Sequence, residues 1–295
     1  MKDFIALFEN YLYNDKKSSE NTVVSYIRDI NQFYSYCTSK NIKDIAKTDK
    51  KFITEYIEYL EKIGKSEATK SRILASLRCF YRFLVSRGFC ETNPVDGFKV
   101  KKVERKLPDV LDASEVLLLL SQPNGIDYKS IRDKAMLELL YATGIKVSEI
   151  IDLTVSDINL QIGIVHLRNG KKERIIPLYP AAVKSIADYL INVRPAIVLE
   201  DDEDKLFTNM TGQQMSRQGF WKIVKHYAET AGIKKDITPH TLRHSFAAHL
   251  LENGAKLSDI KEMLGHADLS STQIYAQLMK SKYTSAYAKF HPLAR

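Results

Sequence analysis

The sequence predicts a mainly α-helical protein of two domains, and three features support this. From residue 1 to about 90, hydrophobic side chains recur at helical spacing between capping residues and glycines. Asn93-Pro94 then ends the helical pattern, and a segment dense in cations follows. Helical patterning returns beyond it, interrupted once by two strand-like segments around Asn169-Gly170. We therefore expect an N-terminal helical domain at 1–91, a basic linker at 92–111 and a mostly helical domain with one small antiparallel sheet at 112–295.

Composition excludes several classes of protein. The 295 residues have a formal net charge of +8, and 44% of them are hydrophobic. Charges interrupt every apolar run well before the roughly 18 residues that a membrane span needs, which excludes a membrane-spanning protein. The first residues contain acids and lack a small-residue cleavage site, so they do not form a secretory signal, and we expect a cytoplasmic location. Cys37, Cys79 and Cys90 are odd in number and have no CxxC spacing, which argues against disulfides and structural zinc.

The excess positive charge is concentrated in the first third of the chain. Residues 1–105 hold 20 basic and 14 acidic side chains, whereas 106–295 hold 24 and 22. Five of the later acids form one run at 200–204, so the rest of that part is also basic. A nucleic acid would explain this bias, because each cation placed against a phosphate releases counterions. Ordinary solubility charge explains the composition equally well.

Four helices are expected in the N-terminal domain, at 2–14, 20–39, 48–63 and 66–87. Plausible N-caps are Ser19, Thr48 and Ser66, and Gly64 and Gly88 mark helix ends. The fourth helix has a buried stripe, made of Ile73, Leu77, Phe80 and Leu84. A second stripe offers cations and hydroxyls without acids, which suits phosphate oxygens in a DNA groove, although basic solvated faces are common; it consists of Lys65, Thr69, Arg72 and Ser76.

In the second domain, helices are expected at about 113–121, 129–142, 146–151, 181–193, 216–231, 239–252 and 258–264. The segments GIVHLR and KKERIIPL flank Asn169-Gly170, a pair that favours a tight hairpin. The helix at 239–252 is well marked, because Thr238 is a natural N-cap and Pro239 suits the first helical position. His240 and Arg243 share one of its faces near the N-terminus, which is an arrangement suited to an anion.

Further along the chain, a short helix ends at Gly265, His266 follows it directly, and the next helix carries Tyr275. A tyrosine hydroxyl with an ordinary pKa near 10 is a poor nucleophile until a base takes its proton or cations stabilise its anion. The chain has 16 tyrosines, so only the surrounding motif distinguishes Tyr275 from a tyrosine on an amphipathic helix.

With these motifs the sequence resembles the tyrosine recombinases of the lambda-integrase family, and most closely the Xer-type members. The resemblance covers essentially the whole chain. It rests on YATGIKVSEI (141–150), KKERIIPL (171–178), HTLRH (240–244), LGH (264–266) and STQIY (271–275). It implies a helical core-binding domain (SAM-like), a basic linker and a catalytic domain, which together form a C-shaped clamp on duplex DNA.

The resemblance also implies transesterification without a metal, a cofactor or ATP. The hydroxyl of Tyr275 would attack a DNA phosphodiester and leave a 3′-phosphotyrosyl link and a free 5′-hydroxyl. Arg243 and a second cation would bind the non-bridging oxygens, where negative charge gathers in the transition state. By the same resemblance, His240 would be the general base, His266 a further donor to the phosphate, and a hairpin lysine the general acid.

The sequence departs from the family pattern at two places. Lys146 stands where the family usually has an arginine, and lysine cannot make the bidentate fork to two phosphate oxygens. The hairpin reads RNGKKER, one residue shorter than the G-K-G-x-K-E-R that the family pattern resembles. We expect Lys171 to be the general acid, with Lys172 as the alternative.

Several readings of the function stay open on the sequence alone. The leading one is an active site-specific recombinase that works as a tetramer on two duplexes, either as a homotetramer or with a second recombinase, under possible control of a DNA translocase. The choice between chromosome or plasmid dimer resolution and mobile-element integration also stays open, although the compact chain favours the former. A DNA-binding protein of the same fold with weakened catalysis, a type IB topoisomerase-like enzyme and a helical scaffold are the alternatives. The tail at 280–295 has Tyr283, Tyr287 and Phe290 at helical spacing, and we expect it to dock into a neighbouring protomer.

Overall fold

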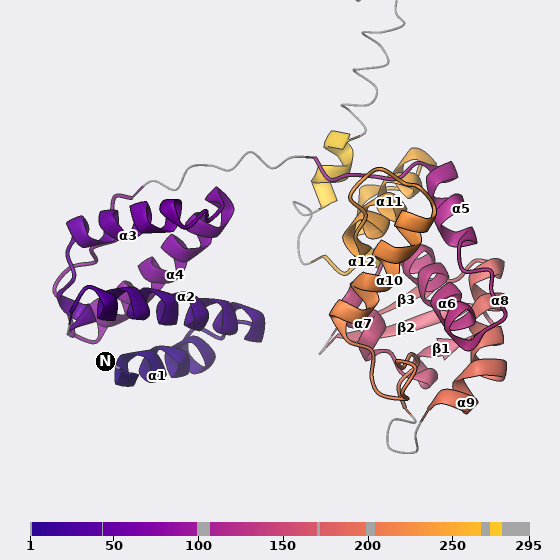
Figure 1. Ribbon diagram of the computed structural model, residues 1–295, viewed down its shortest axis with the longest axis horizontal. Helices are drawn as coiled ribbons and strands as arrows, with labels where there is room; N and C mark the ends of the chain where they lie inside the picture. Colours follow the sequence, from indigo (N-terminus) through magenta and orange to yellow (C-terminus); the bar gives the residue numbers. More distant parts are fainter. Residues whose placement is uncertain are drawn as a thin grey trace, which may run out of the picture. The chain divides into compact units, whose positions relative to one another are not determined.

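The structure, a computed structural model, describes residues 2–42, 44–98, 107–169, 172–198, 204–266 and 272–278. The chain divides into two compact units, residues 1–105 and 106–295 (Figure 1). Helices dominate both units, and among the described residues the second unit contains one three-stranded antiparallel sheet. The predicted fold class is therefore confirmed. The expected domain limits at 91 and 112 stay predictions, and residues 99–106 of the expected linker lie outside the described residues.

The first unit is helical in all its regular elements. These are α1 (Lys2–Asn10), the π-helical turn η1 (Tyr11–Asp15), α2 (Glu20–Ser39), the 3-10 turn η2 (Ile45–Lys47), α3 (Lys50–Lys62) and α4 (Glu67–Ser86). The side chains of Ser19 and Ser66 accept hydrogen bonds from backbone N–H groups, so both act as the predicted N-caps. Gly64 and Gly88 follow α3 and α4 with φ of +74° and +72°, a conformation that favours glycine.

One local prediction in this unit, the N-cap Thr48, was wrong, and the first helix, confirmed over its predicted length, changes its type along the chain. Helix α3 begins at Lys50, because the carboxylate of Asp49 accepts from the N–H of Phe52 and caps the helix. Thr48 instead follows η2, and its hydroxyl donates to the carbonyl of Ile45 at 3.1 Å. The expected helix at 2–14 is regular only to Asn10, after which the backbone widens into a π-helical turn.

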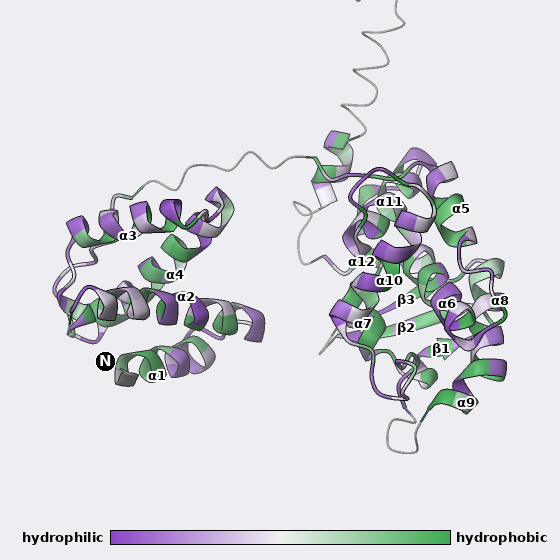
Figure 2. Cartoon of the chain, viewed as in Figure 1, coloured by the Kyte–Doolittle hydropathy of each residue, from purple (hydrophilic) through white to green (hydrophobic). Residues whose placement is uncertain are grey.

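The core of the first unit lies where α2 packs against α4. All four residues of the predicted buried stripe are fully buried: Ile73, Leu77, Phe80 and Leu84. Aromatic rings from other helices complete this core, with Phe8 against Phe80 at 5.2 Å and Phe33 against Tyr56 at 4.8 Å between ring centroids. Figure 2 shows hydrophobic and hydrophilic residues interleaved along these helices, as expected for helices with one buried face. The buried stripe predicted from the sequence is therefore the face of α4 that packs into the core.

The second unit contains the remaining elements. Its helices are α5 (Ala113–Ser121), α6 (Tyr128–Thr143), α7 (Val147–Asp152), α8 (Pro180–Asp188), α9 (Arg194–Ile197), α10 (Arg217–Thr230), α11 (Pro239–Glu252) and α12 (Leu257–Leu264). Short turns of other helix types are η3 (Val155–Asp157) and η4 (Tyr189–Val193), and a further helix spans 272–278. No helix among the residues described is long and apolar enough to cross a membrane.

The sheet has the order β1 (Ile158–Asn159), β2 (Ile164–Asn169) and β3 (Lys172–Pro177). Strands β2 and β3 form the predicted antiparallel hairpin, with Val165 opposite Ile176 and Asn169 opposite Lys172. Strand β1 was not predicted, because its length of two residues is too short to show an alternating pattern. Gly170 and Lys171, at the hairpin turn, lie outside the described residues.

Helix α6 lies at the centre of the second unit and packs against α8 and α11. Most of its residues are buried, and it ends at Gly144, which has φ of +58°. A smaller hydrophobic cluster lies beside the main core. It brings together Phe246 of α11, Leu264 of α12 and Tyr275 of the helix at 272–278. The end of α6 and the last helices of the chain thus meet in one region.

We predict that Gly144→Ala lowers the free energy of unfolding by about 2–5 kcal/mol, measured by urea denaturation. A side chain at φ of +58° strains the backbone, and its Cβ would overlap the ring of Phe246. Gly232→Ala is the matched control, because Gly232 has φ of +67° and no atom within 4 Å of the added Cβ. Equal losses in the two variants would show that the contact with Phe246 has no energetic weight.

Candidate active site

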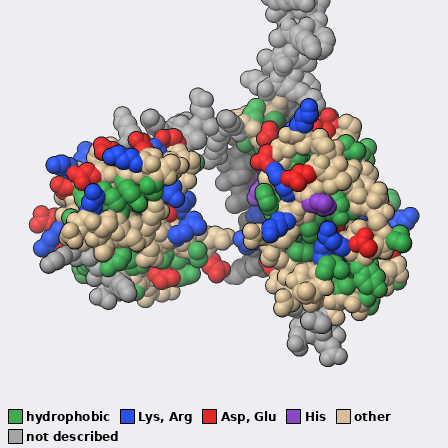
Figure 3. Space-filling view, in the orientation of Figure 1, with side chains coloured by type: hydrophobic (Ala, Val, Ile, Leu, Met, Phe, Trp, Pro, Cys, Tyr) green, Lys and Arg blue, Asp and Glu red, His purple; other side chains and the backbone are tan. Residues whose placement is uncertain are grey.

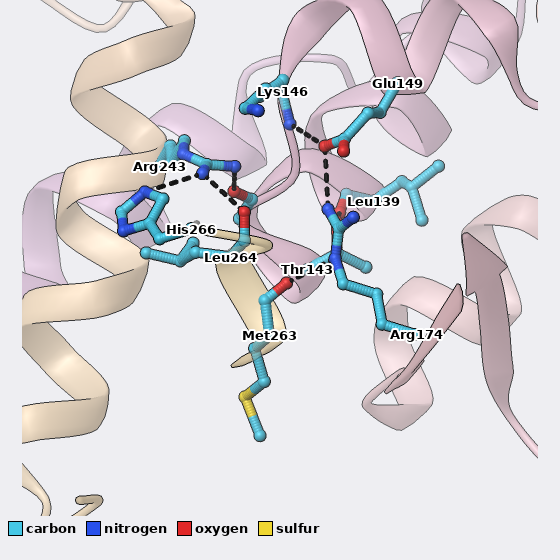
Figure 4. Close-up of polar contacts among 10 residues, drawn as sticks. Leu139, Thr143, Lys146, Glu149, Arg174, Arg243, Met263, Leu264 and His266 are labelled. Carbon is cyan, nitrogen blue, oxygen red and sulfur yellow. Dashed lines mark hydrogen bonds and ion pairs between the residues drawn. The ribbon is translucent and has the colours of Figure 1, made fainter. Parts of the chain in front are cut away.

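The side chain of Arg243 on α11 lies at the centre of the site, and only 4% of it is exposed. Its Nη1 donates to the carbonyl of Gly144 at 2.7 Å, and its Nη2 donates to the carbonyl of Leu264 at 2.8 Å. Figure 4 shows the guanidinium directed at these carbonyls. Burial lowers the pKa of Arg243 from its ordinary value, yet an arginine stays charged in proteins. A fixed positive charge therefore joins the ends of α6 and α12 to α11.

His266 is the third partner of this guanidinium. Its Nε2 lies 3.1 Å from Nη2 of Arg243 and accepts the hydrogen bond, because a guanidinium can only donate. The remaining ring nitrogen, Nδ1, lies 2.9 Å from the hydroxyl oxygen of Thr272 and can donate to it. These two contacts assign the neutral tautomer with the proton on Nδ1. The structure thus brings Arg243 and His266 together, two residues that the sequence singled out.

Lys146 is the N-cap residue of α7, two positions beyond the carbonyl that Arg243 binds. Its backbone N–H donates to Oε2 of Glu149 at 2.8 Å, whereas its side chain is exposed and makes no hydrogen bond within the described part of the chain. The ammonium group is consequently available to an external anion, and the turn that carries it is fixed by Glu149 (Figure 4).

Arg174 on β3 and Glu149 on α7 support the site, and sequence reasoning gave neither a role. Nη2 of Arg174 donates to Oε2 of Glu149 at 2.9 Å, and its Nε donates to the carbonyl of Met263 at 2.8 Å. Their side chains are only 10% and 13% exposed. The pair connects the hairpin strand to α7 and α12. Both residues lie inside quoted motifs, but their pairing joins distant segments and leaves no local pattern.

Tyr275 is only 1% exposed, and its hydroxyl oxygen lies 2.9 Å from Nδ1 of His244. Burial, with a smaller contribution from the basic groups His240, Arg243 and His266 nearby, lowers the pKa of His244 to about 4, so its ring is neutral near pH 7. We assign Nδ1 as the acceptor, because a phenol is the better donor. Burial also raises the pKa of Tyr275, which the charge of Arg243 partly opposes. The tyrosine is therefore protonated in this arrangement.

His240, the expected general base, is not the histidine that contacts the hydroxyl of Tyr275. It lies exposed in the first turn of α11, and no hydrogen bond to it is present among the described residues. The hydroxyl of Tyr275 contacts His244 instead, a residue that sequence reasoning did not select. The available signal was its spacing, since His244 follows His240 by four positions and so shares its helix face.

Of the two hairpin lysines, Lys172 lies within the described residues and Lys171, the expected general acid, does not. Lys172 is the first residue of β3, and its backbone pairs with Asn169. No group of residues suited to hold a metal ion occurs among the described residues.

Two members of the expected DNA-contacting stripe of α4 contact a buried acid in the structure. Ser76 is fully buried, and its hydroxyl donates to Oδ2 of the buried Asp29 at 2.8 Å, so it does not lie on a surface stripe. The guanidinium of Arg72 pairs with the same carboxylate, which corrects the expectation of a face without acids. The pattern along α4 did not reveal this because Asp29 comes from α2. Lys65 is exposed, and the hydroxyl of Thr69 lies 2.9 Å from that of the cap Ser66.

Charged side chains do not gather into one basic patch on the face shown in Figure 3, where lysines and arginines alternate with acids. A phosphate ligand would therefore be bound by the individual cations of the site, chiefly Arg243 and Lys146, and less by the overall charge of the molecule.

Comparisons with known proteins give a consistent result. The profile of the phage integrase family matches residues 109–282, and that of the phage integrase N-terminal SAM-like domain matches residues 5–88. The chain is 41% identical to tyrosine recombinase XerD of Staphylococcus epidermidis over 295 residues, all of both chains. It is 44% identical to tyrosine recombinase XerD of Halalkalibacterium halodurans over 278 residues, which cover 94% of this chain and 93% of the relative.

Solved structures show the same fold. The crystal structure of XerA recombinase covers 98% of this chain and 99% of its own, at 26% identity and a TM-score of 0.55. XerH site-specific recombinase, in a post-cleavage complex with a palindromic difH substrate, has a TM-score of 0.75 at 22% identity, over 92% of this chain and 81% of its own.

Proposed function

The chain belongs to the phage integrase family and is a Xer-like tyrosine recombinase, and we propose that it cuts and rejoins duplex DNA at specific sites through Tyr275. The observation that carries this proposal is the arrangement around Arg243. A buried guanidinium bonded to His266 lies in the same region of the fold as a tyrosine hydroxyl bonded to His244. Fixed donors of this kind stabilise negative charge that develops on a phosphate.

In the proposed reaction, the hydroxyl oxygen of Tyr275 forms a bond to a DNA phosphorus as the bond to the 5′ oxygen breaks. The products are a 3′-phosphotyrosyl link and a free 5′-hydroxyl. Attack on this link by a 5′-hydroxyl forms a DNA phosphodiester again and releases the tyrosine; the 5′-hydroxyl of the same strand reverses the cleavage, and that of another strand completes an exchange. One phosphodiester replaces another, so the exchange needs neither a metal nor ATP. His240 would accept the tyrosine proton, and Lys171 would protonate the departing oxygen.

The cations would act on the non-bridging oxygens of the phosphate. Arg243 uses three N–H contacts for Gly144, Leu264 and His266, and the rest of its N–H groups make no contact within the described ranges. These remaining groups and the ammonium of Lys146 would bind the oxygens. The side chain of His266 would donate to the phosphate after giving up one of its present partners.

The buried position of Tyr275 adds a requirement. A phosphodiester cannot reach a hydroxyl on a residue that is 1% exposed. We propose that the helix at 272–278 moves when DNA and a second protomer bind, so that cleavage is coupled to assembly. The resting protomer would then be inactive as a nuclease.

The weakened-catalysis alternative has a specific observation in its favour. Lys146 supplies one ammonium where the family pattern has a guanidinium, so it cannot hold two phosphate oxygens in a fixed geometry. We propose that cleavage proceeds with Lys146 but more slowly than with arginine at this position.

For partners, we propose duplex DNA held by both units, as a clamp, and a tetramer on two recombination sites. We propose chromosome or plasmid dimer resolution rather than mobile-element integration, in the cytoplasm, with a second recombinase and a DNA translocase as candidate partners. The relatives named tyrosine recombinase XerD support a Xer-like recombinase. In the first unit, Lys65, Thr69 and Arg72 stay the proposed DNA contacts.

The tail at 280–295 lies outside the described residues, and its exchange between protomers stays a proposal. A suitable receptor exists in the second unit, a pocket of about 430 Å³ with mostly apolar walls. Its lining includes Tyr141, Tyr179, Phe246, His249, Leu250 and Met263. We propose that Tyr287 and Phe290 of a neighbouring tail enter this pocket.

We predict that the wild-type protein forms a covalent adduct with a nicked duplex that carries its recombination site, and that Tyr275→Phe abolishes the adduct. The nick lets the cleaved end diffuse away, so the phosphotyrosyl link accumulates and is seen on a denaturing gel. Duplex binding by Tyr275→Phe should stay within about threefold of wild type, because only a buried hydroxyl is lost.

Tyr128→Phe is the matched control and should keep the adduct, because Tyr128 is an exposed tyrosine of the same unit. An adduct that persists in Tyr275→Phe would contradict the assignment of the nucleophile. Relaxation of supercoiled plasmids regardless of sequence would instead favour a topoisomerase-like enzyme.

We predict that Lys146→Arg increases the single-turnover rate of cleavage by about tenfold or more, since a guanidinium can bind two phosphate oxygens at once. Lys256→Arg is the matched control, because Lys256 is likewise an exposed N-cap lysine without a side-chain cap bond. A slower Lys146→Arg enzyme would show that the site is adapted to lysine. An adduct formed only by Lys146→Arg would support the weakened-catalysis alternative.

A further inference from the structure

The contact between Tyr275 and His244 has no part in the proposed chemical step. The tyrosine hydroxyl and Nδ1 of His244 are 2.9 Å apart, whereas the expected base, His240, is exposed one turn earlier on α11. His244 is thus placed to hold the nucleophile in its resting position.

The helix at 272–278 is attached to the second unit at two polar points. One is the bond from Tyr275 to His244, and the other is the 2.9 Å contact of Thr272 with His266. Thr272 is fully buried. Between these points the helix packs into the cluster that contains Phe246 and Leu264. The apolar contacts favour docking of the helix in general, whereas the two polar contacts fix its register.

We propose that His244 is a positioning residue that withholds the nucleophile, by holding the hydroxyl of Tyr275 in its buried resting position until the helix at 272–278 moves. The identity of Tyr275 as nucleophile rests on the proposed function, but the contact itself does not.

The chemistry of the imidazole suits this role. Burial and nearby basic groups keep the His244 ring neutral near pH 7, so Nδ1 retains the lone pair that accepts the hydrogen bond from the hydroxyl of Tyr275. A phenol buried without an acceptor is costly, so loss of the acceptor favours the released state of the helix. The equilibrium between docked and released helix should therefore depend on one acceptor atom at residue 244.

Two substitutions distinguish the effect of the acceptor atom from the effect of the aromatic ring. His244→Phe keeps an aromatic ring of similar size but has no acceptor, and His244→Asn places an amide oxygen close to the position of Nδ1. His226→Gln on α10 is the control, because it removes an exposed histidine of the same unit. The readout is hydrogen–deuterium exchange of the peptide that covers 272–278 in the full chain without DNA.

We predict that His244→Phe increases this exchange by about tenfold, whereas His244→Asn and His226→Gln stay near wild type. Tyr275→Phe leaves the acceptor of His244 without its donor, so it should also raise exchange, and the double variant, which buries neither group unpaired, should raise it less than His244→Phe alone. Unchanged exchange in His244→Phe, or an equal increase in His244→Asn, would overturn the proposal.

Adduct formation on the nicked duplex is the second readout. A released tyrosine should react sooner, so His244→Phe should form the adduct faster than wild type and His244→Asn at the wild-type rate. A slower adduct in His244→Phe would overturn the withholding role even if exchange rises. If the wild-type protein forms no adduct on DNA that it binds, the proposed function fails, and the exchange result still decides whether His244 holds Tyr275.

Discussion

The buried guanidinium of Arg243 is the interaction on which the rest of the site depends. A charge taken out of water costs several kcal/mol unless it is well hydrogen-bonded, and here the carbonyls of Gly144 and Leu264 and the ring of His266 accept three hydrogen bonds from the guanidinium. The same bonds fix the ends of α6 and α12 against α11. A glycine ends each of these two helices, Gly144 after α6 and Gly265 after α12. Because Gly265 has no side chain, it leaves room for Arg174, whose Nη1 lies 2.8 Å from the place that a Cβ would occupy. The cation is therefore in place before any phosphate arrives.

In this arrangement the contacts that stabilise the protomer also occupy groups that the proposed reaction uses. Burial that fixes Arg243 also encloses Tyr275, raises the pKa of its hydroxyl and pairs it with a neutral His244. The hydrogen bonds of Tyr275 and His266 thus occupy two groups to which the proposed reaction gives a role. In that reaction, bound DNA would have to supply contacts that replace them. Cleavage by an isolated protomer would then be disfavoured for the same physical reason that the protomer is well packed.

Local features of the fold were accessible from the sequence. The caps Ser19 and Ser66, the stripe of α4 and the β2–β3 hairpin each follow from neighbours along the chain. Features that depend on a second element were not accessible. Asp29, which accepts the hydrogen bond from Ser76, lies on another helix. The pair of Arg174 and Glu149 likewise joins a strand to α7. His244 was overlooked for a similar reason, since its partner lies 31 positions away. Periodicity predicts which face is buried, but not what covers it.

Replacement of Arg243 by lysine tests the central claim most directly. Lysine keeps the charge but cannot bridge the two carbonyls that hold the guanidinium. Single-turnover cleavage of the nicked duplex and affinity for the same duplex should be measured together, with circular dichroism to confirm the fold. We expect cleavage to fall by about a hundredfold or more while duplex affinity stays within about threefold. Cleavage within about threefold of wild type would contradict it, because the site would then not depend on a bridging guanidinium.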